Sequence, residues 1–151
     1  MHALTVQQPF ATLILLGLKT AETRRWPTDY RGPLLIHASA SSTLPKSMVD
    51  YAWAVLAKVG VVAPLPVRAI IGGVQLTDCD VAKTDRFTDM HLGYYGPGWF
   101  AFQMRDPVLF NHAIPCGGDI GLWQLPRRLI AKVPLSFSGR HTSLRSHRPF
   151  D

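Results

Sequence analysis

Short apolar segments separated by Gly and Pro constrain the fold of this chain more than any other feature. Segments with the composition of strands outnumber those that resemble helices, and the two kinds do not alternate along the chain. A parallel, doubly wound sheet needs a helix between successive strands, so the pattern argues against that architecture. The sequence therefore predicts an α+β fold, a small and mostly antiparallel β-barrel with two main helices packed on it.

The expected elements follow from local periodicity. One apolar helix is expected at residues 10–16, with Pro9 as its first residue and Gly17 as its terminator. A second, amphipathic helix is expected at residues 44–59, because its apolar side chains recur at i, i+3, i+4 and i+7. Strands are expected at residues 3–7, 20–25, 33–38, 67–76, 99–104, 108–110 and 121–125, with a loop or short surface helix at 78–90.

The length and composition of the chain fit one folded domain. It has 151 residues, of which 47% are hydrophobic and 17% are charged. No apolar run approaches the roughly 20 residues of a membrane-spanning helix, and the N-terminus lacks the pattern of a signal peptide. Cys79 and Cys116 stand apart, and the histidines have no metal-ligand spacing. We therefore expect a cytoplasmic protein with free thiols, no membrane partner, no metal and no cofactor.

Positive charge is concentrated at the C-terminal end. From residue 127 onward, six basic residues stand against one acid (6 − 1 = +5), which leaves +1 of the net +6 for residues 1–126. Concentrated positive charge favours polyanions through counterion release, although a basic tail can also serve only to keep a neutral domain in solution. We expect a domain at residues 1–126 and a basic, partly mobile extension at 127–151. Its candidate contacts to a nucleic-acid backbone are Arg127, Arg128, Arg140, Arg145 and Arg148.

A cluster of opposite charges follows the first expected helix. An ammonium, a carboxylate and a guanidinium stand within six positions at Lys19, Glu22 and Arg24, and Glu22 is the only glutamate of the chain. Side chains alternate across an extended strand, so Thr20 and Trp26 are expected on the same face as Glu22 and Arg24. Such a cluster either binds a polar ligand or neutralises itself as a structural ion pair.

Several spaced motifs occur together in the chain. A first group joins Gln8-Pro9-Phe10, the pattern Gly17-x-Lys19-x-x-Glu22-x-Arg24 and residues 30–38, and a second group comprises residues 99–102, 106–107 and 114–123. Over residues 3–126 these motifs resemble the ASCH (activating signal cointegrator homology) domain family, which is related to PUA-like barrels. The resemblance implies a PUA-like barrel and a cleft beside the first motif that binds RNA or a modified nucleoside.

The chemistry of these residues suits a nucleotide. A cation can hold a phosphate, the glutamate can accept a hydrogen bond from an exocyclic amine, and an aromatic ring can stack on the base. Gln8 is expected to cap the first helix or to contact an edge of the ligand. The candidate ligand-binding residues are Gln8, Lys19, Glu22, Arg24, Trp26, Tyr94 and Tyr95.

Three classes of function are consistent with these residues. The main prediction is a module that binds RNA or a nucleoside-type small molecule beside the GxKxxExR pattern. The alternative is a hydrolase on the same ligand, either a metal-independent ribonuclease or an N4-acylcytidine amidohydrolase. In it Lys19 and Glu22 would be catalytic, and Thr20 or Thr23 would be weaker candidates. The third class is a protein-interaction module in which the charges are only structural.

The amidohydrolase alternative departs from the pattern of the enzymes that it resembles. Those enzymes use a Lys, a Thr three positions later and a distant Glu. Lys19 matches, but Glu22 stands at the position of the Thr, and no second glutamate exists. Asp85 or Asp89 would have to supply the missing carboxylate.

Overall fold

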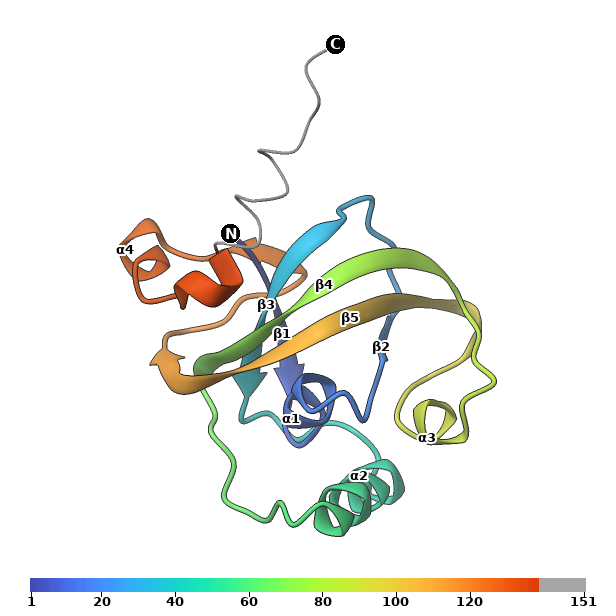
Figure 1. Ribbon diagram of the computed structural model, residues 1–151. Coiled ribbons are helices and arrows are strands. Elements are labelled where there is room, and N and C mark those ends of the chain that lie inside the picture. The colour runs from blue at the N-terminus through green and yellow to red at the C-terminus, as the bar shows by residue number, and fades with distance from the viewer. Residues whose placement is uncertain (139–151) are drawn as a thin grey trace.

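The structure, a computed structural model, describes residues 1–138. Six strands form one mixed sheet in the order β2-β5-β4-β3-β1-β6, and the sheet curves into a half-barrel (Figure 1). This arrangement confirms the predicted α+β class. The strands are β1 (His2–Gln7), β2 (Ala21–Arg24), β3 (Gly32–Ser39), β4 (Ala69–Ala82), β5 (Gly96–Pro115) and β6 (Leu122–Gln124), and the helices are α1 (Phe10–Leu15), α2 (Lys46–Lys58), α3 (Phe87–Met90) and α4 (Arg127–Ile130).

The parallel pairing of β1 and β3 makes the sheet mixed. Ala3 lies beside Leu35 and Gln7 beside Ser39 in this pair, whereas the other strand pairs of residues 1–138 run antiparallel. A parallel pair needs a crossover, and here α1 and β2 provide it between the two strands. The crossover places the charged run that follows α1 at the opposite edge of the sheet from β6.

Helix α1 fills the inside of the curved sheet. All six of its residues are buried, as expected for a helix that is apolar on every side. The Gln8 amide oxygen accepts hydrogen bonds from the Thr12 N–H at 3.1 Å and from the Thr12 hydroxyl at 3.0 Å. Gly17 ends the segment with a φ of 75°, a conformation that favours glycine. Gln8 therefore has the capping role that the sequence suggested.

The two long strands β4 and β5 extend further than their composition indicated. Residues 78–82 belong to β4, so the predicted loop there was wrong, and one strand covers both 99–104 and 108–110. Asp78 pairs with Gln103 and Asp80 with Ala101, through a register with several bulges. The side chains of Asp78 and Asp80 face solvent, so the local sequence lacks the apolar pattern of a strand. The strand forms here because β5 pairs with it, and a local pattern cannot show such a partner.

The chain after β6 packs on the other face of the sheet. Leu129, Val133 and Phe137 are buried there, against a cluster that includes Leu35 and Ile70. The expected domain end at residue 126 therefore lies before a segment that shares the core. Arg140, Arg145 and Arg148 lie outside the described residues, so their predicted contacts stay predictions. No helix within residues 1–138 is long and apolar enough to cross a membrane.

Removing the Phe137 ring tests whether the last described segment is part of the core. Phe137 is 1% exposed, and a methyl group added at Gly73 would overlap its ring. We expect Phe137→Ala to lower the free energy of unfolding by about 3–5 kcal/mol, as for other buried aromatic truncations. Chemical denaturation measures this loss.

The matched control for this experiment is the nearby Leu135→Ala. Leu135 is 84% exposed, so its truncation is expected to change stability by less than about 0.5 kcal/mol. Equal effects of the two truncations would contradict the packing of this segment on the sheet.

Candidate functional site

A cavity of about 470 Å³ lies between β1, β2, α2 and the loop that follows α3. One part of its wall is polar and comes from β2, and another part is aromatic. The residues of this wall that carry the argument are Glu22, Arg24, Trp26, Tyr94 and Trp99.

Glu22 forms the centre of the polar wall. Its Oε1 lies 3.2 Å from the Lys19 ammonium and its Oε2 lies 3.2 Å from Arg24 Nη2. Burial by itself would raise the pKa of the Glu22 carboxyl, but the charges and hydrogen bonds of Lys19 and Arg24 hold this pKa below its ordinary value. Glu22 therefore presents an ionised, acceptor-only group to the cavity at neutral pH.

Lys19 lies behind Glu22 and not in the wall of the cavity. Its side chain is 0% exposed, whereas that of Glu22 is 12% exposed. The ammonium donates to the Ala21 carbonyl at 2.6 Å and pairs with Glu22. The structure does not bring Lys19, a candidate ligand-binding residue of the sequence, into the cavity wall, because the turn after α1 directs this side chain inward. Lys19 supports the carboxylate and has no direct path to a ligand.

Arg24 is the cation that reaches the cavity. Its Nη2 donates to the Thr5 carbonyl at 2.8 Å as well as to Glu22, and its side chain is about one quarter exposed. The backbone carbonyl of Thr5 in β1 thus holds the Arg24 guanidinium in place. No pattern in the sequence pointed to Thr5, because its contribution comes from the main chain. Two bonds at one nitrogen orient the guanidinium plane, so its remaining donors have a defined direction.

The aromatic wall consists of rings from two segments. Tyr94 stacks on Trp99 with ring centroids 4.4 Å apart, and the Arg25 guanidinium lies 4.3 Å from the Trp99 ring. The Tyr94 N–H donates to the Thr23 hydroxyl at 2.8 Å, which ties the loop after α3 to β2. Trp99 was not among the ligand-binding candidates of the sequence, because nothing in its local pattern singled it out.

Asp89 is a structural residue beneath this loop. It is 1% exposed, and its carboxylate accepts from the Thr20 N–H at 2.9 Å and from the Thr20 hydroxyl at 2.6 Å. Arg86 Nε lies 3.0 Å from the same carboxylate. Thr20 is therefore turned away from the cavity, in contrast to its expected place beside Glu22. A catalytic role for this hydroxyl has no support from its position.

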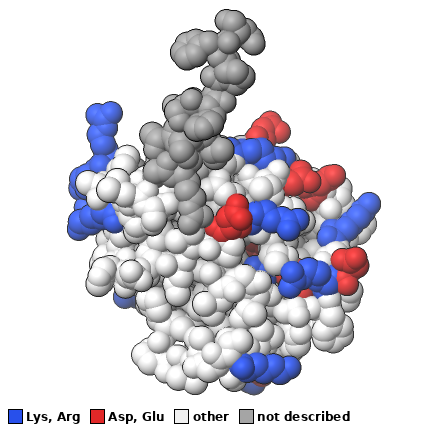
Figure 2. All heavy atoms as spheres, in the orientation of Figure 1, with Lys and Arg blue, Asp and Glu red and all other residues white. Residues whose placement is uncertain are grey.

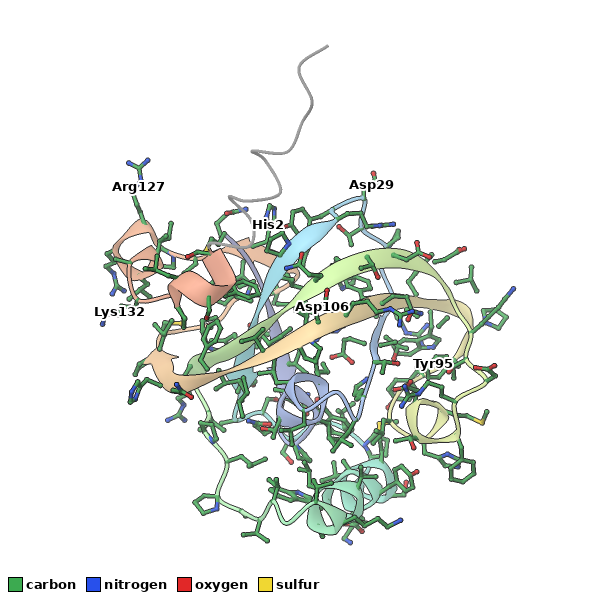
Figure 3. The ribbon with its side chains drawn as sticks, viewed as in Figure 1. His2, Asp29, Tyr95, Asp106, Arg127 and Lys132 are labelled. Atoms are coloured by element: carbon green, nitrogen blue, oxygen red, sulfur yellow. The ribbon has the colours of Figure 1, made fainter. Side chains whose placement is uncertain are left out.

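Tyr95 points into the body of the protein instead of the cavity. Its hydroxyl is buried without a hydrogen-bond partner within residues 1–138, and Figure 3 shows the residue close to α3. Burial, together with the nearby charges of Asp89 and Glu22, raises the pKa of this phenol far above its ordinary value. Tyr95 is thus a half-buried residue with a neutral phenol, and it does not line the cavity as Tyr94 does.

The remaining candidates lie away from the cavity. Gln8 is occupied with Thr12 and with the Pro66 carbonyl at 2.9 Å. Arg127 and Arg128 are exposed on α4, and Figure 3 shows Arg127 pointing away from the protein on the opposite side of the view from Tyr95. In Figure 2, basic side chains gather near α4, whereas basic and acidic groups alternate on the other side of this face.

The chain matches the family model described as "ASCH domain" over residues 4–105. It is 30% identical over 132 residues to activating signal cointegrator 1 of Homo sapiens, and 28% identical to the Mus musculus protein of that name. Each alignment covers 83% of this chain and 22% of the relative, so the chain spans about a fifth of the length of these relatives.

Solved structures of an ASCH protein from Zymomonas mobilis share the fold. One has a TM-score of 0.55 at 16% identity and covers 87% of this chain and 92% of its own. A point mutant of the same protein has a TM-score of 0.52 and covers 95% and 94% of the two chains. At this identity the likeness concerns the fold alone.

Removing the charge of Glu22 tests its role as the partner of a buried ammonium. Glu22→Gln leaves Lys19 buried without a full counter-ion, so we expect a loss of about 3–5 kcal/mol in the free energy of unfolding at neutral pH. The double variant Lys19→Met/Glu22→Gln is expected to recover most of this loss, because it removes both charges. Urea denaturation of the wild type, Lys19→Met, Glu22→Gln and the double variant measures the coupling.

The pH dependence of stability provides a second readout. The pKa of Glu22 is lowered in the folded state, so its stabilisation is complete above the ordinary value of 4.5 and is lost as the pH falls through the folded pKa. Glu22→Gln should therefore lose less stability than the wild type on acidification below pH 4.5. Parallel pH profiles, or an equal loss in the single and double variants, would contradict the buried pair.

Proposed function

The chain belongs to the ASCH domain family, and we propose that it binds RNA or a modified nucleobase, with the base held in the cavity beside Glu22 and Arg24. The PUA-like fold of the family is associated with RNA binding. The observation that carries the proposal is an ionised carboxylate facing a cavity of about 470 Å³ that also has an aromatic wall. This combination of groups suits a planar ligand with hydrogen-bond donors on its edge.

The charge of Glu22 favours the base over the phosphate of a nucleotide. A carboxylate accepts hydrogen bonds from exocyclic amines, whereas it repels a phosphate group. Arg24 beside it offers donors to carbonyl or ring-nitrogen acceptors of the same base. The pair can therefore contact both kinds of group on one edge of a base, and Tyr94 or Trp26 can stack on its face.

The position of Lys19 favours a binding protein over the hydrolase alternative. A catalytic lysine must come within hydrogen-bond distance of the reacting atoms, and the Lys19 ammonium is separated from the cavity by Glu22. Thr20 is held by Asp89, and the Thr23 hydroxyl is engaged by the Tyr94 N–H. We therefore propose that Lys19 positions Glu22 for recognition and does not act on the ligand itself.

The exposed basic residues of α4 and of the turn after it support a contact to the nucleic-acid backbone. Arg127, Arg128 and Lys132 are exposed in this segment. They lie outside the cavity wall, so they would attract the strand without reading its bases. We also propose a cytoplasmic location, because Cys79 and Cys116 are free and a reducing compartment preserves thiols.

Truncating one aromatic ring of the cavity tests the proposal. Loss of one stacked base contact costs about 1–3 kcal/mol, so Tyr94→Ala should weaken the binding of short single-stranded RNA by roughly 5- to 150-fold. The control is Phe87→Ala, an aromatic residue of α3 that is 68% exposed and does not line the cavity. Fluorescence anisotropy with labelled RNA measures both affinities. Equal affinities of the two variants would contradict the placement of the base.

Incubation with substrates separates binding from catalysis. We expect labelled RNA and N4-acetylcytidine to stay intact when mixed with the protein and a chelator, because the ammonium is shielded from the cavity. Gel electrophoresis and chromatography measure the products. Turnover that Lys19→Met abolishes, in protein that is still folded, would show the hydrolase alternative to be correct.

A further inference from the structure

A second cavity of about 550 Å³ adjoins the first. It lies near the end of β3 and the chain between β5 and β6, and its wall includes Arg68 and His37. The two cavities share part of their walls, so they lie side by side. The residues that line both are Thr5, Ser39, Ser41, Asp119 and Ile120.

Arg68 provides the basic group of the second cavity. Its backbone has a φ of 53°, a conformation that residues other than glycine rarely adopt. The main chain is fixed on both sides, because the Arg68 N–H donates to the Ala38 carbonyl at 2.7 Å and the Cys116 N–H donates to the Arg68 carbonyl at 3.1 Å. Such strain persists where the surroundings determine the conformation, and it is concentrated at binding sites.

The guanidinium of Arg68 is available to a ligand. Within residues 1–138 it has no hydrogen bond or ion pair, although Asp119 lines the same cavity. Arg24, in contrast, is engaged with Glu22 and Thr5. There is thus an engaged arginine in the first cavity and an unpaired arginine in the second.

His37 leaves a second unpaired group in this wall. Its Nε2 lies 2.9 Å from the Cys116 carbonyl, which can only accept, so Nε2 carries the hydrogen. Nδ1 is then an acceptor, and it is buried without a partner in the described chain. Gly118 covers it, since a Cβ at this position would come within 2.8 Å of Nδ1. Because Gly118 covers this atom, His37 forms part of the wall of the second cavity and offers no direct contact to a ligand.

We propose that the two cavities together hold one ribonucleotide unit of an RNA strand. The inference rests on the proposed function and extends it: with the base in the first cavity, the ribose hydroxyls meet the Asp119 carboxylate, and the phosphate meets the Arg68 guanidinium. Carboxylates bind ribose hydroxyls and guanidinium groups bind phosphates in nucleotide sites. Asp119 lies on the shared wall, where the sugar that links base and phosphate has to pass.

The order of charges agrees with this assignment. The Arg24 charge of the first cavity is already engaged by Glu22, whereas the Arg68 charge has no partner within residues 1–138, so a phosphate is attracted more strongly to the second cavity. The RNA strand therefore binds in one orientation, with the base toward β2 and the phosphate toward the end of β3. The same arrangement favours RNA over DNA, because DNA has no 2′-hydroxyl to donate to Asp119.

Removing Arg68 tests the phosphate contact. Arg68→Gly suits a φ of 53° and so preserves the fold while deleting the guanidinium. Binding of a short single-stranded RNA of mixed sequence should weaken about tenfold, and the slope of log K against log salt should fall by about 0.7, the value of one phosphate contact. Arg68→Lys should keep the slope. The matched control is Lys58→Gln, which removes one exposed charge that lines neither cavity.

The sugar contact is tested with the DNA strand of the same sequence. Asp119→Ala, which removes the acceptor, should reduce the ratio of RNA affinity to DNA affinity by about fivefold, the value of one hydrogen bond. An unchanged salt slope in Arg68→Gly, with binding that still depends on Tyr94, would overturn the phosphate site and leave the proposed function standing. An unchanged RNA to DNA ratio in Asp119→Ala would overturn the sugar contact. Failure of the wild-type protein to bind RNA would overturn both proposals.

Discussion

The buried pairing of Lys19 with Glu22 is the interaction on which the candidate site depends. The ammonium lies between the end of α1 and the start of β2, where only a charged partner compensates its loss of hydration. Its presence keeps the Glu22 carboxyl ionised despite burial. Arg24 completes the set and is itself held by the Thr5 carbonyl of β1. A structural ion pair and a binding group are therefore the same residues, and the two interpretations of the sequence do not exclude each other.

The fold positions this cluster by covering both faces of one curved sheet. α1 lies inside the curve and carries the chain directly to Lys19, while Phe137 and its neighbours cover the opposite face. The glycines at 72 and 73 in β4 allow this double packing, because Leu15 lies against Gly72 and Phe137 against Gly73. The strand thus admits large side chains on both faces at its centre.

Local patterns were sufficient for most of the fold and for part of the site. Periodicity located α1 and α2, and alternation placed Glu22, Arg24 and Trp26 on one face of an extended strand. The depth of Lys19 could not be predicted, because it depends on the path of the turn before β2. Residues 78–82 include the polar side chains of Asp78 and Asp80 and become a strand through pairing with β5. Arg68 and Asp119 are far apart in the sequence, and the antiparallel pairing of β4 with β5, in which Ala69 lies beside Pro115, brings their segments together.

The double hydrogen bond from Thr20 to Asp89 has a mechanical consequence for the cavity. Asp89 belongs to α3, and the chain that leaves this helix carries Tyr94, whose N–H is bonded to Thr23. The loop is therefore held at two points, at Thr20 just before β2 and at Thr23 within β2, and these lie on either side of Glu22 along the chain. The spacing between the Glu22 carboxylate and the Tyr94 ring is thereby fixed before a ligand binds. Binding then costs little conformational entropy for ordering the site.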